Sequence, residues 1–329
     1  MIHLKQAVRA LLKTPFLTTV AVLSLALGIG ANAGIFSMFE QILLRSMPVV
    51  EPDRLANLSA PGPKPGSQSC NQAGDCEVVL SYPMLRDLEA EHPGFTGIAG
   101  HRIFGANIAQ GDRTLDGEGM LVSGGYFSLL GVRPALGRLL QPADDAVPGE
   151  HPVAVLSHRF WRTELGADPD VLNSTIVVNG RTMTVVGVAA RGFDGTTLGA
   201  QPDVFVPISM RQAIEPLFDG FEDRRSYWVY AFGRLAPGES LDRSEAAING
   251  VYSAIINETE AELQTGMSQT TLAAFRDRQL IVEPGSRGQS SVHEEARTPL
   301  YMLLGITGLV LLIACANIAN LLLARGAQR

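Results

Sequence analysis

Two of the three cysteines in the sequence lie six residues apart. Cys70 and Cys76 lie in a loop rich in proline, glycine and serine, PGPKPGSQSCNQAGDCE. Thiols at this spacing can form a short disulfide if the loop is exported into an oxidising compartment, and they are free thiols in a mobile loop otherwise. Both interpretations stay open. The pair is a poor zinc site, because no histidine stands near it to complete the ligand set.

Other residue types that catalyse reactions occur without the partners that catalysis needs. His293 and Glu294 do not begin a zinc-protease motif, because Arg297 stands where the second histidine is required. The remaining histidines show no metal-ligand spacing. The sequence lacks both the G-x-x-x-x-G-K-[ST] phosphate loop and the G-x-S-x-G nucleophile elbow. It therefore predicts neither an enzyme nor a bound cofactor, and the chain cannot bind ATP through a phosphate loop.

One acidic pair, Asp144 and Asp145, stands in a loop that also holds Pro142 and Pro148. Carboxylates in such a loop are usually hydrated, so the pair is predicted to lie in a solvated turn. A weak cation site is the alternative, because carboxylate oxygens are ligands of Ca²⁺.

Two long apolar runs, residues 16–39 and 299–324, organise the rest of the chain. The second reads PLYMLLGITGLVLLIACANIANLLLA and contains no charged residue. At 1.5 Å per residue, about 26 helical residues reach roughly 39 Å, enough to cross a hydrocarbon core of ~30 Å with some tilt. The sequence therefore predicts a membrane-spanning helix with a stalk over residues 15–44, a second span over 299–324, and a cytoplasmic end over 325–329.

A short amphipathic helix is predicted before the first span, over residues 1–14. Lys5, Arg9 and Lys13 recur every four residues along one side of it, and apolar residues cover the other side. A basic amphipathic helix next to a span is typical of an interfacial helix whose cations contact lipid headgroups.

Small and polar residues inside the two runs predict helix packing within the membrane. Small residues let a second helix approach closely, and an asparagine that faced lipid would be costly. These residues are therefore predicted to face the other span, a second copy of the chain, or further spans. They are Gly30, Asn32 and Gly34 in the first run, and Gly305, Gly308, Asn317 and Asn320 in the second.

The charge distribution predicts which parts of the chain are exported. Residues 46–298 hold 20 basic and 32 acidic groups, a net charge of −12, whereas the segments around the apolar runs are basic. Basic ends beside the spans indicate cytoplasmic termini and an exported middle, with Arg45 as the exception. An acidic exported domain also argues against a nucleic-acid partner, since phosphate binding needs a basic surface.

The middle of the chain, residues 45–298, mixes strand and helix signals and predicts an α+β domain. Its clearest signal is Asn179-Gly180 between two β-branched runs, which predicts a hairpin. Ser81 and Ser240 are predicted to cap helices over residues 82–92 and 241–263. Strands are expected within 96–123 and at 153–156, 203–208, 227–235 and 279–282; short helices are expected early in 124–140 and at 160–165; a linker is expected over 48–54 and 61–76.

Several stretches of the sequence resemble MacB-like ABC transporter permeases. LALGIGANAGIFSMFEQILLRSMPV is similar to their first span. VSGGYFSLLGVRPALGRLLQPADD and VAVLSHRFWRTELGADPDVLNSTIVVNGRTMTVVGVAARGFDG are similar to their periplasmic core domain, and LLIACANIANLLLARGAQR to the second span, where the FtsX-like permease domain begins. The resemblance covers most of the chain and is greatest to the duplicated permeases common in acidobacteria.

The resemblance implies a fold and a function that the residues alone do not. In such a permease, a porter-like subdomain and an inserted lobe form a periplasmic domain between two transmembrane helices. The permease lies in the inner membrane with both termini in the cytoplasm, as a dimer or as one half of a duplicated permease. It works with an ATPase, and in some members with an envelope partner. ATP-driven movement of the helices passes to the periplasmic domain and serves export or other envelope processes.

Two further expectations follow from the resemblance. Permeases of this kind continue with more spans, so a sequence that stops at Arg329 is expected to be a fragment of a longer permease. The alternative function is a membrane-tethered periplasmic sensor or scaffold without transport activity. The resemblance supplies no catalytic residues, and the sequence does not identify a substrate.

Overall fold

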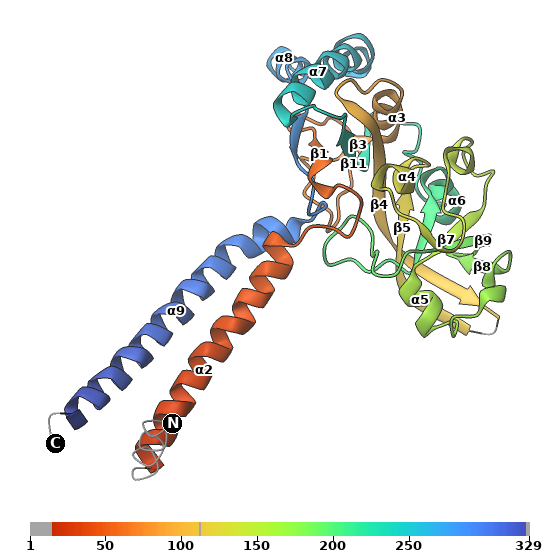
Figure 1. The fold of residues 1–329 in the computed structure, drawn as a ribbon. Helices are drawn as coiled ribbons and strands as arrows, with labels where there is room; N and C mark the ends of the chain where they lie inside the picture. The colour runs from red at the N-terminus through yellow and green to blue at the C-terminus, as the bar shows by residue number, and fades with distance from the viewer. Residues whose placement is uncertain (1–14, 112, 327–329) are drawn as a thin grey trace. The chain divides into compact units, whose positions relative to one another are not determined.

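A computed structural model describes residues 15–111 and 113–326 (Figure 1). The structure divides into two units, one of residues 1–45 with 292–329 and one of residues 46–291. The predicted interfacial helix with Lys5, Arg9 and Lys13 lies outside the described residues.

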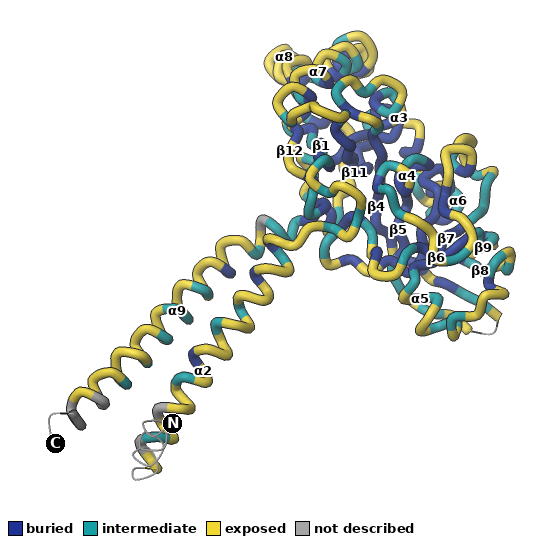
Figure 2. Tube along the Cα trace, in the orientation of Figure 1, coloured by how far each residue is buried: buried dark blue, intermediate teal, exposed yellow. Residues whose placement is uncertain are grey.

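The first unit consists of two long helices. Helix α2 (Pro15–Phe39) continues into a π-helical turn (Glu40–Leu44), and α9 (Ser291–Gly326) begins eight residues before the predicted start at Pro299. Both are long and apolar enough to cross a membrane, over Thr18–Leu44 and Ser291–Asn320. Figure 2 shows that most of their residues are exposed, as expected of helices that face lipid rather than a protein core.

Polar and apolar contacts join α2 to α9. The Asn32 Nδ2 atom donates to the Thr307 carbonyl at 3.0 Å, and the Thr307 hydroxyl donates to Asn32 Oδ1 at 3.1 Å. A side chain at Gly28 would meet Leu311 at 3.0 Å, so the helices approach closely there. Nearer the second unit in sequence, Phe39 packs edge-on against Tyr301, with ring centroids 5.1 Å apart.

The other predicted packing residues have no neighbour of this kind. Among the described residues, nothing lies within 4 Å of a Cβ built at the four glycines, and both remaining asparagines are exposed. Their packing against helices outside this chain therefore stays a prediction. The residues are Gly30, Gly34, Gly305, Gly308, Asn317 and Asn320.

The second unit is built on one mixed sheet. Its strand order is β12-β1-β11-β4-β5-β10-β7-β9-β6, with β2 and β3 paired to β11 and β8 paired to β4 and β9. The strands are β1 (Leu55–Ser59), β2 (Ser67–Gln68), β3 (Leu80–Ser81), β4 (Phe95–Gln110), β5 (Arg113–Val122), β6 (Pro134–Gly137), β7 (Val153–Leu156), β8 (Thr175–Val178), β9 (Arg181–Ala189), β10 (Val204–Pro207), β11 (Ser226–Leu235) and β12 (Ile281–Pro284).

Helices cover both faces of this sheet. They are α3 (Tyr82–Ala90), α4 (Tyr126–Leu130), α5 (His158–Thr163), α6 (Arg211–Ile214), α7 (Leu241–Ala254) and α8 (Gln269–Arg276), with a π-turn (Ile255–Glu260) and 3₁₀ turns (Pro52–Arg54, Pro142–Asp145, Pro169–Val171, Ile208–Met210, Ala261–Leu263). Leu85 of α3, Ile248 of α7 and Phe275 of α8 pack into one apolar cluster, and Phe127 of α4 packs into a second one with Phe205. Burying each such side chain stabilises the fold by about 2 kcal/mol.

The long hairpin of β4 and β5 ties the sheet together. Residues 95–101 of β4 pair with β11, while Ile108 and Ala109 pair with β8. At the same time, β5 pairs in parallel with β10 through Gly119 to Val122. The same hairpin therefore pairs with strands at both ends of the sheet. Residues 46–291 form one unit, in which the two predicted subdomains are not separated.

Sequence signals that act locally are confirmed. Val178 pairs with Arg181 across Asn179-Gly180, both of which have the positive φ that this tight hairpin turn requires. The hydroxyl groups of Ser81 and Ser240 accept the amide hydrogens of Met84 and Arg243, so both are N-caps.

Several elements differ from the prediction. The structure has strands and helices that are not predicted, namely β1, β2, β3, α6 and α8. Strand β6 begins at Pro134, where a turn is expected. Strand β11 also departs from the strict alternation of faces expected of a strand with Tyr227, Val229 and Ala231 on one side and Trp228 and Tyr230 on the other, because its pairing register with β3 shifts between Tyr227 and Val229. A bulge turns the strand, so Trp228 and Val229 enter the same apolar cluster.

The Asn32–Thr307 contact predicts a specific loss of stability. Asn32→Leu should weaken the α2–α9 pair by about 1 kcal/mol, because it removes the hydrogen bonds between the helices. Asn317→Leu is the control, since it removes an exposed amide from α9. Denaturation of the full chain in detergent, followed by a fluorophore pair on the two helices, measures the difference. Equal midpoints for the two variants would contradict the role of Asn32.

Candidate functional site: the gripped linkers

Two linkers connect the sheet unit to the long helices, and they are joined to each other. The first linker is residues 46–54, and the second linker is residues 285–291. The Met47 amide donates to the Ser286 carbonyl at 2.8 Å. The backbone of a segment without a sheet or helix ladder needs other hydrogen-bond partners when it is buried. Buried side chains supply them here.

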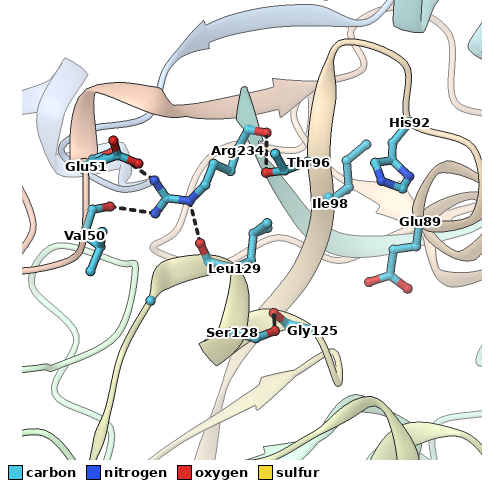
Figure 3. Close-up of a pocket in the computed structure, with 12 residues that line it drawn as sticks. Val50, Glu51, Glu89, His92, Thr96, Ile98, Gly125, Ser128, Leu129 and Arg234 are labelled. Atoms are coloured by element: carbon cyan, nitrogen blue, oxygen red, sulfur yellow. Dashed lines mark hydrogen bonds between the residues drawn. The ribbon is translucent and has the colours of Figure 1, made fainter. Parts of the chain in front are cut away.

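Arg234 grips the first linker. From the end of β11, its guanidinium donates to the carbonyls of Leu129, Glu51 and Val50, at 2.6, 3.0 and 2.7 Å (Figure 3). Leu129 lies in the last turn of α4, where carbonyl groups lack partners within the helix. The flat, forked guanidinium spreads its donors over three nitrogens in a rigid plane, so it reaches three separated carbonyls, whereas the donors of an ammonium group all sit on one nitrogen. Burial lowers the pKa of Arg234, and the charge of Arg54 lowers it further.

A strained residue fixes the path of the same linker. Glu51 has φ 43°, the left-handed region that non-glycine residues rarely adopt. Its carboxylate forms an ion pair with Arg54 at 2.6 Å, and Arg54 also donates to the Leu235 carbonyl at 2.7 Å. The contacts of Arg234 and Arg54 hold this conformation in place.

Gln289 grips the second linker. Its side-chain amide donates to the Ala231 carbonyl at 2.9 Å, so its oxygen is free to accept from His101 Nε2 at 2.7 Å. Burial lowers the pKa of His101 to about 4, and the ring is therefore neutral at neutral pH. The Asn57 side chain donates to the Gly288 carbonyl at 3.0 Å, and the backbone amide of Gln289 donates to the Thr196 carbonyl at 2.8 Å.

Glycine is required beside that contact. Gly288 has φ +80°, and a Cβ there would lie 2.2 Å from the Thr196 carbonyl oxygen. The second linker is thus held from β1, β4, β11 and the loop after β9. A displacement of any of these elements changes the position of residue 289.

A cavity of about 480 Å³ lies beside the Arg234 contacts. Figure 3 shows Glu89 and His92 on one side of it and Arg234 on the other, with Ile98 between them. Burial raises the pKa of Glu89 to about 7, and the charge of Asp145 raises it further, while Ser123 and Arg86 favour the charged form. The cavity therefore holds a carboxyl group that titrates near neutral pH.

The prediction of a solvated turn at Asp144-Asp145 is wrong. Asp144 forms two hydrogen bonds with the Arg138 guanidinium, at 2.6 and 2.8 Å, and is buried. Asp145 accepts the amide hydrogens of Gly124 and Ser209, at 3.0 and 2.8 Å. Arg138 lies six residues before Asp144, whereas Gly124 and Ser209 lie 21 and 64 residues from Asp145, so only the partner of Asp144 is close in sequence. Within residues 15–111 and 113–326, no group of three or more His, Cys, Asp or Glu residues could hold a metal ion.

The cysteine pair is bonded in the structure. Cys70 and Cys76 form a disulfide with their Cα atoms 5.2 Å apart, and Cys315 is free. The sequence interpretation missed Arg234 and Gln289. One signal for Arg234 was present, because it is the only charged residue in the apolar strand SYWVYAFGRL. Gln289 lies in an irregular segment, and no pattern marked it.

The hydrogen bonds of Arg234 predict a large loss of stability when its side chain is removed. Arg234→Ala should lower the free energy of unfolding by about 2 kcal/mol, because the carbonyls of Val50, Glu51 and Leu129 lose a charged donor. Arg234→Lys should recover less than half of that loss. Arg113→Ala is the control, since this strand arginine is 66% exposed. Urea denaturation of the full chain gives the three values, and a loss below about 1 kcal/mol for Arg234→Ala would show that water replaces the guanidinium.

The pKa of Glu89 predicts a pH dependence of stability. A carboxyl group with a raised pKa in the folded state favours folding at low pH, and this contribution is lost as pH rises from 4.5 to about 7. Glu89→Gln cannot ionise, so it should gain on the order of 2 kcal/mol relative to the native chain between pH 4.5 and 8. Urea midpoints across this range measure it, with the exposed Glu91→Gln as control. Parallel curves for the native chain and Glu89→Gln would refute the shift.

Comparisons with known proteins were made for sequence and structure. A family model described as the MacB-like periplasmic core domain matches residues 18–251. No curated protein sequence matches the chain. Similar solved structures include the periplasmic region of MacB from Actinobacillus actinomycetemcomitans, with 10% identity and a TM-score of 0.48 over 77% of this chain and 94% of that one.

Two other solved structures match the chain. A domain of a permease protein from Porphyromonas gingivalis shares 17% identity, with a TM-score of 0.47 over 75% of this chain and 98% of that one. The extracellular domain of the noncanonic ABC-type transporter YknZ from Gram-positive bacteria shares 12% identity, with a TM-score of 0.42 over 58% and 88%. The family model spans more than half of the sequence, including α2 and most of the sheet unit, and the chain belongs to the family of MacB-like periplasmic core domains of ABC transporter permeases.

Proposed function

We propose that this chain is part of an ABC transporter permease in which the sheet unit and the membrane helices move together. The observation that carries the proposal is that side chains of the sheet unit and of the second linker hold both linkers by hydrogen bonds. Arg234 holds the first linker through two part-buried hydrogen bonds, and Gln289 holds the second linker against β4 and β11 through two buried ones. Such contacts transmit displacement because breaking them leaves buried polar groups without partners.

We expect movement to pass from α9 to the sheet, because a continuous helix is stiffer than the linker that joins it to the sheet. Helix α9 starts at Ser291, within the second linker, and a helix moves as a rod over many residues. A shift of α9 along its axis would pull on Gln289 and through it on β4 and β11. The hairpin of β4 and β5 would then carry the shift to β10 and β8. We propose that these two ends of the sheet correspond to a porter-like lobe and an inserted lobe.

The remaining parts of the proposal concern partners and topology. An ATPase subunit would bind ATP, and a second copy or a second permease half would pack on the exposed small and polar residues of α2 and α9. Both helices would cross the inner membrane, with cytoplasmic termini and a periplasmic sheet unit. A reporter that works only outside the cytoplasm, fused after Gly220, tests this orientation: activity is expected, and inactivity there would reverse it.

Coupling through Gln289 can be tested in a reconstituted complex. The full chain, in lipid bilayers with the ABC ATPase that co-purifies with it, should change the distance between labels on β8 and β12 when ATP is hydrolysed. Gln289→Ala should lower the amplitude of this change several-fold and leave ATP hydrolysis within about twofold, because only the link to α9 is weakened. Gln201→Ala removes an exposed glutamine and serves as control.

Two outcomes would contradict the proposal. If no ATPase associates with the chain, the alternative of a tethered sensor or scaffold is favoured. If the label distance changes equally in native chain and Gln289→Ala, the movement does not pass through the second linker.

A further inference from the structure

The disulfide closes a small loop that rests on the sheet. The disulfide loop is residues 70–76, and the hydroxyl of Tyr230 in β11 lies beneath it. This hydroxyl accepts the Asn71 amide hydrogen at 2.7 Å and donates to the Gly74 carbonyl at 2.8 Å. Asn71 also donates from its side chain to the Ile103 carbonyl of β4 at 3.0 Å. The loop therefore contacts two central strands through these hydrogen bonds, and Ala73 also packs with Tyr227 and Tyr230 of β11.

The same loop contacts the first residue of α9. The Ser291 amide donates to the Gln72 carbonyl at 3.1 Å, and the Gln72 side chain donates to Glu118 of β5 at 3.0 Å. The first amides of a helix have no carbonyl partner within the helix. The disulfide loop supplies one, at the residue where the second linker becomes α9.

Exposure and packing make this bond accessible. Cys70 is exposed and Cys76 is half-buried, whereas Ala73 is the one buried apolar residue of the loop. With so little apolar burial, the loop keeps its conformation through the covalent bond and a few hydrogen bonds. Breaking the bond would free the loop without opening the apolar core, because Tyr230 itself stays packed in β11.

We propose that the Cys70–Cys76 disulfide is a reversible thiol–disulfide exchange site that sets how firmly the start of α9 is held. A thiolate of an external dithiol attacks Cys70 Sγ, forms a mixed disulfide and releases the Cys76 thiolate, which takes up a proton. The second thiol of the reductant then attacks the mixed disulfide and releases Cys70 as a thiol. Two electrons and two protons pass to the chain, and the dithiol leaves as a disulfide.

Reduction loosens the disulfide loop and its contact with Ser291, while Gln289 still holds the second linker. The reduced chain thus keeps its fold but allows α9 more freedom at its first residue. Any consequence for transport rests on the proposed function. The change in hydrogen-exchange protection of residues 285–291 is expected whether or not the proposed function is correct.

Hydrogen exchange on the full chain in detergent tests the proposal, with dithiothreitol as the probe dithiol. Reduction should speed amide exchange in a peptide covering residues 285–293 by about tenfold, because one stabilising contact is lost. Exchange in the β8–β9 hairpin should not change. Alkylation of the thiols, read by mass, verifies that both Cys70 and Cys76 are reduced.

Two variants separate the disulfide from other effects. Asn71→Ala keeps the disulfide but removes the contact with Ile103, and it should raise exchange at residues 285–293 without reduction. Cys315→Ser should behave as the native chain. The proposal fails if reduction leaves exchange at residues 285–293 unchanged, if the folded chain resists reduction, or if reduction removes protection throughout the sheet. The last result would make the bond a structural staple.

Discussion

Hydrogen bonds from buried side chains to two irregular linkers are the constraint on which this structure depends. A chain that leaves a sheet to become a helix passes through a stretch with no ladder partners, and each buried carbonyl or amide there needs a specific donor or acceptor. Arg234 donates to two carbonyls of the first linker and to one of nearby α4. Gln289 accepts from His101 in β4 and donates to the Ala231 carbonyl in β11. These contacts lie where the sheet unit and the long helices are continuous in sequence.

The electrostatics of the site follow from this constraint. A guanidinium can stay charged when buried because carbonyl dipoles surround it, and its rigid fork fixes their spacing. His101, in contrast, is neutral because burial lowers its pKa, and its Nε2 atom donates to the Gln289 side chain. Glu89 lies between these extremes, beside a cavity that water can enter, and its charge depends on the pH.

Local chemistry made part of the fold predictable, and distance in sequence hid the rest. The Asn179-Gly180 turn and the caps at Ser81 and Ser240 depend on a few consecutive residues, so the sequence reveals them. The Arg234 contacts join residues more than 100 positions apart, and the bulge in β11 depends on pairing with β3. Asp145 appeared solvated for the same reason, since Ser209 lies 64 residues away, whereas the partner of Asp144 is the nearby Arg138, which no motif marked.

The hydrogen bond between Met47 and Ser286 has a consequence for how such permeases diversify. It places the two ends of the sheet unit next to each other, as in domains that tolerate insertion into a host chain. A unit with adjacent ends can be exchanged for another of different size or surface without altering the separation of the points where it is attached. Selection can then act on the exported part and on the helix bundle as nearly independent modules, with only the two linkers obliged to match.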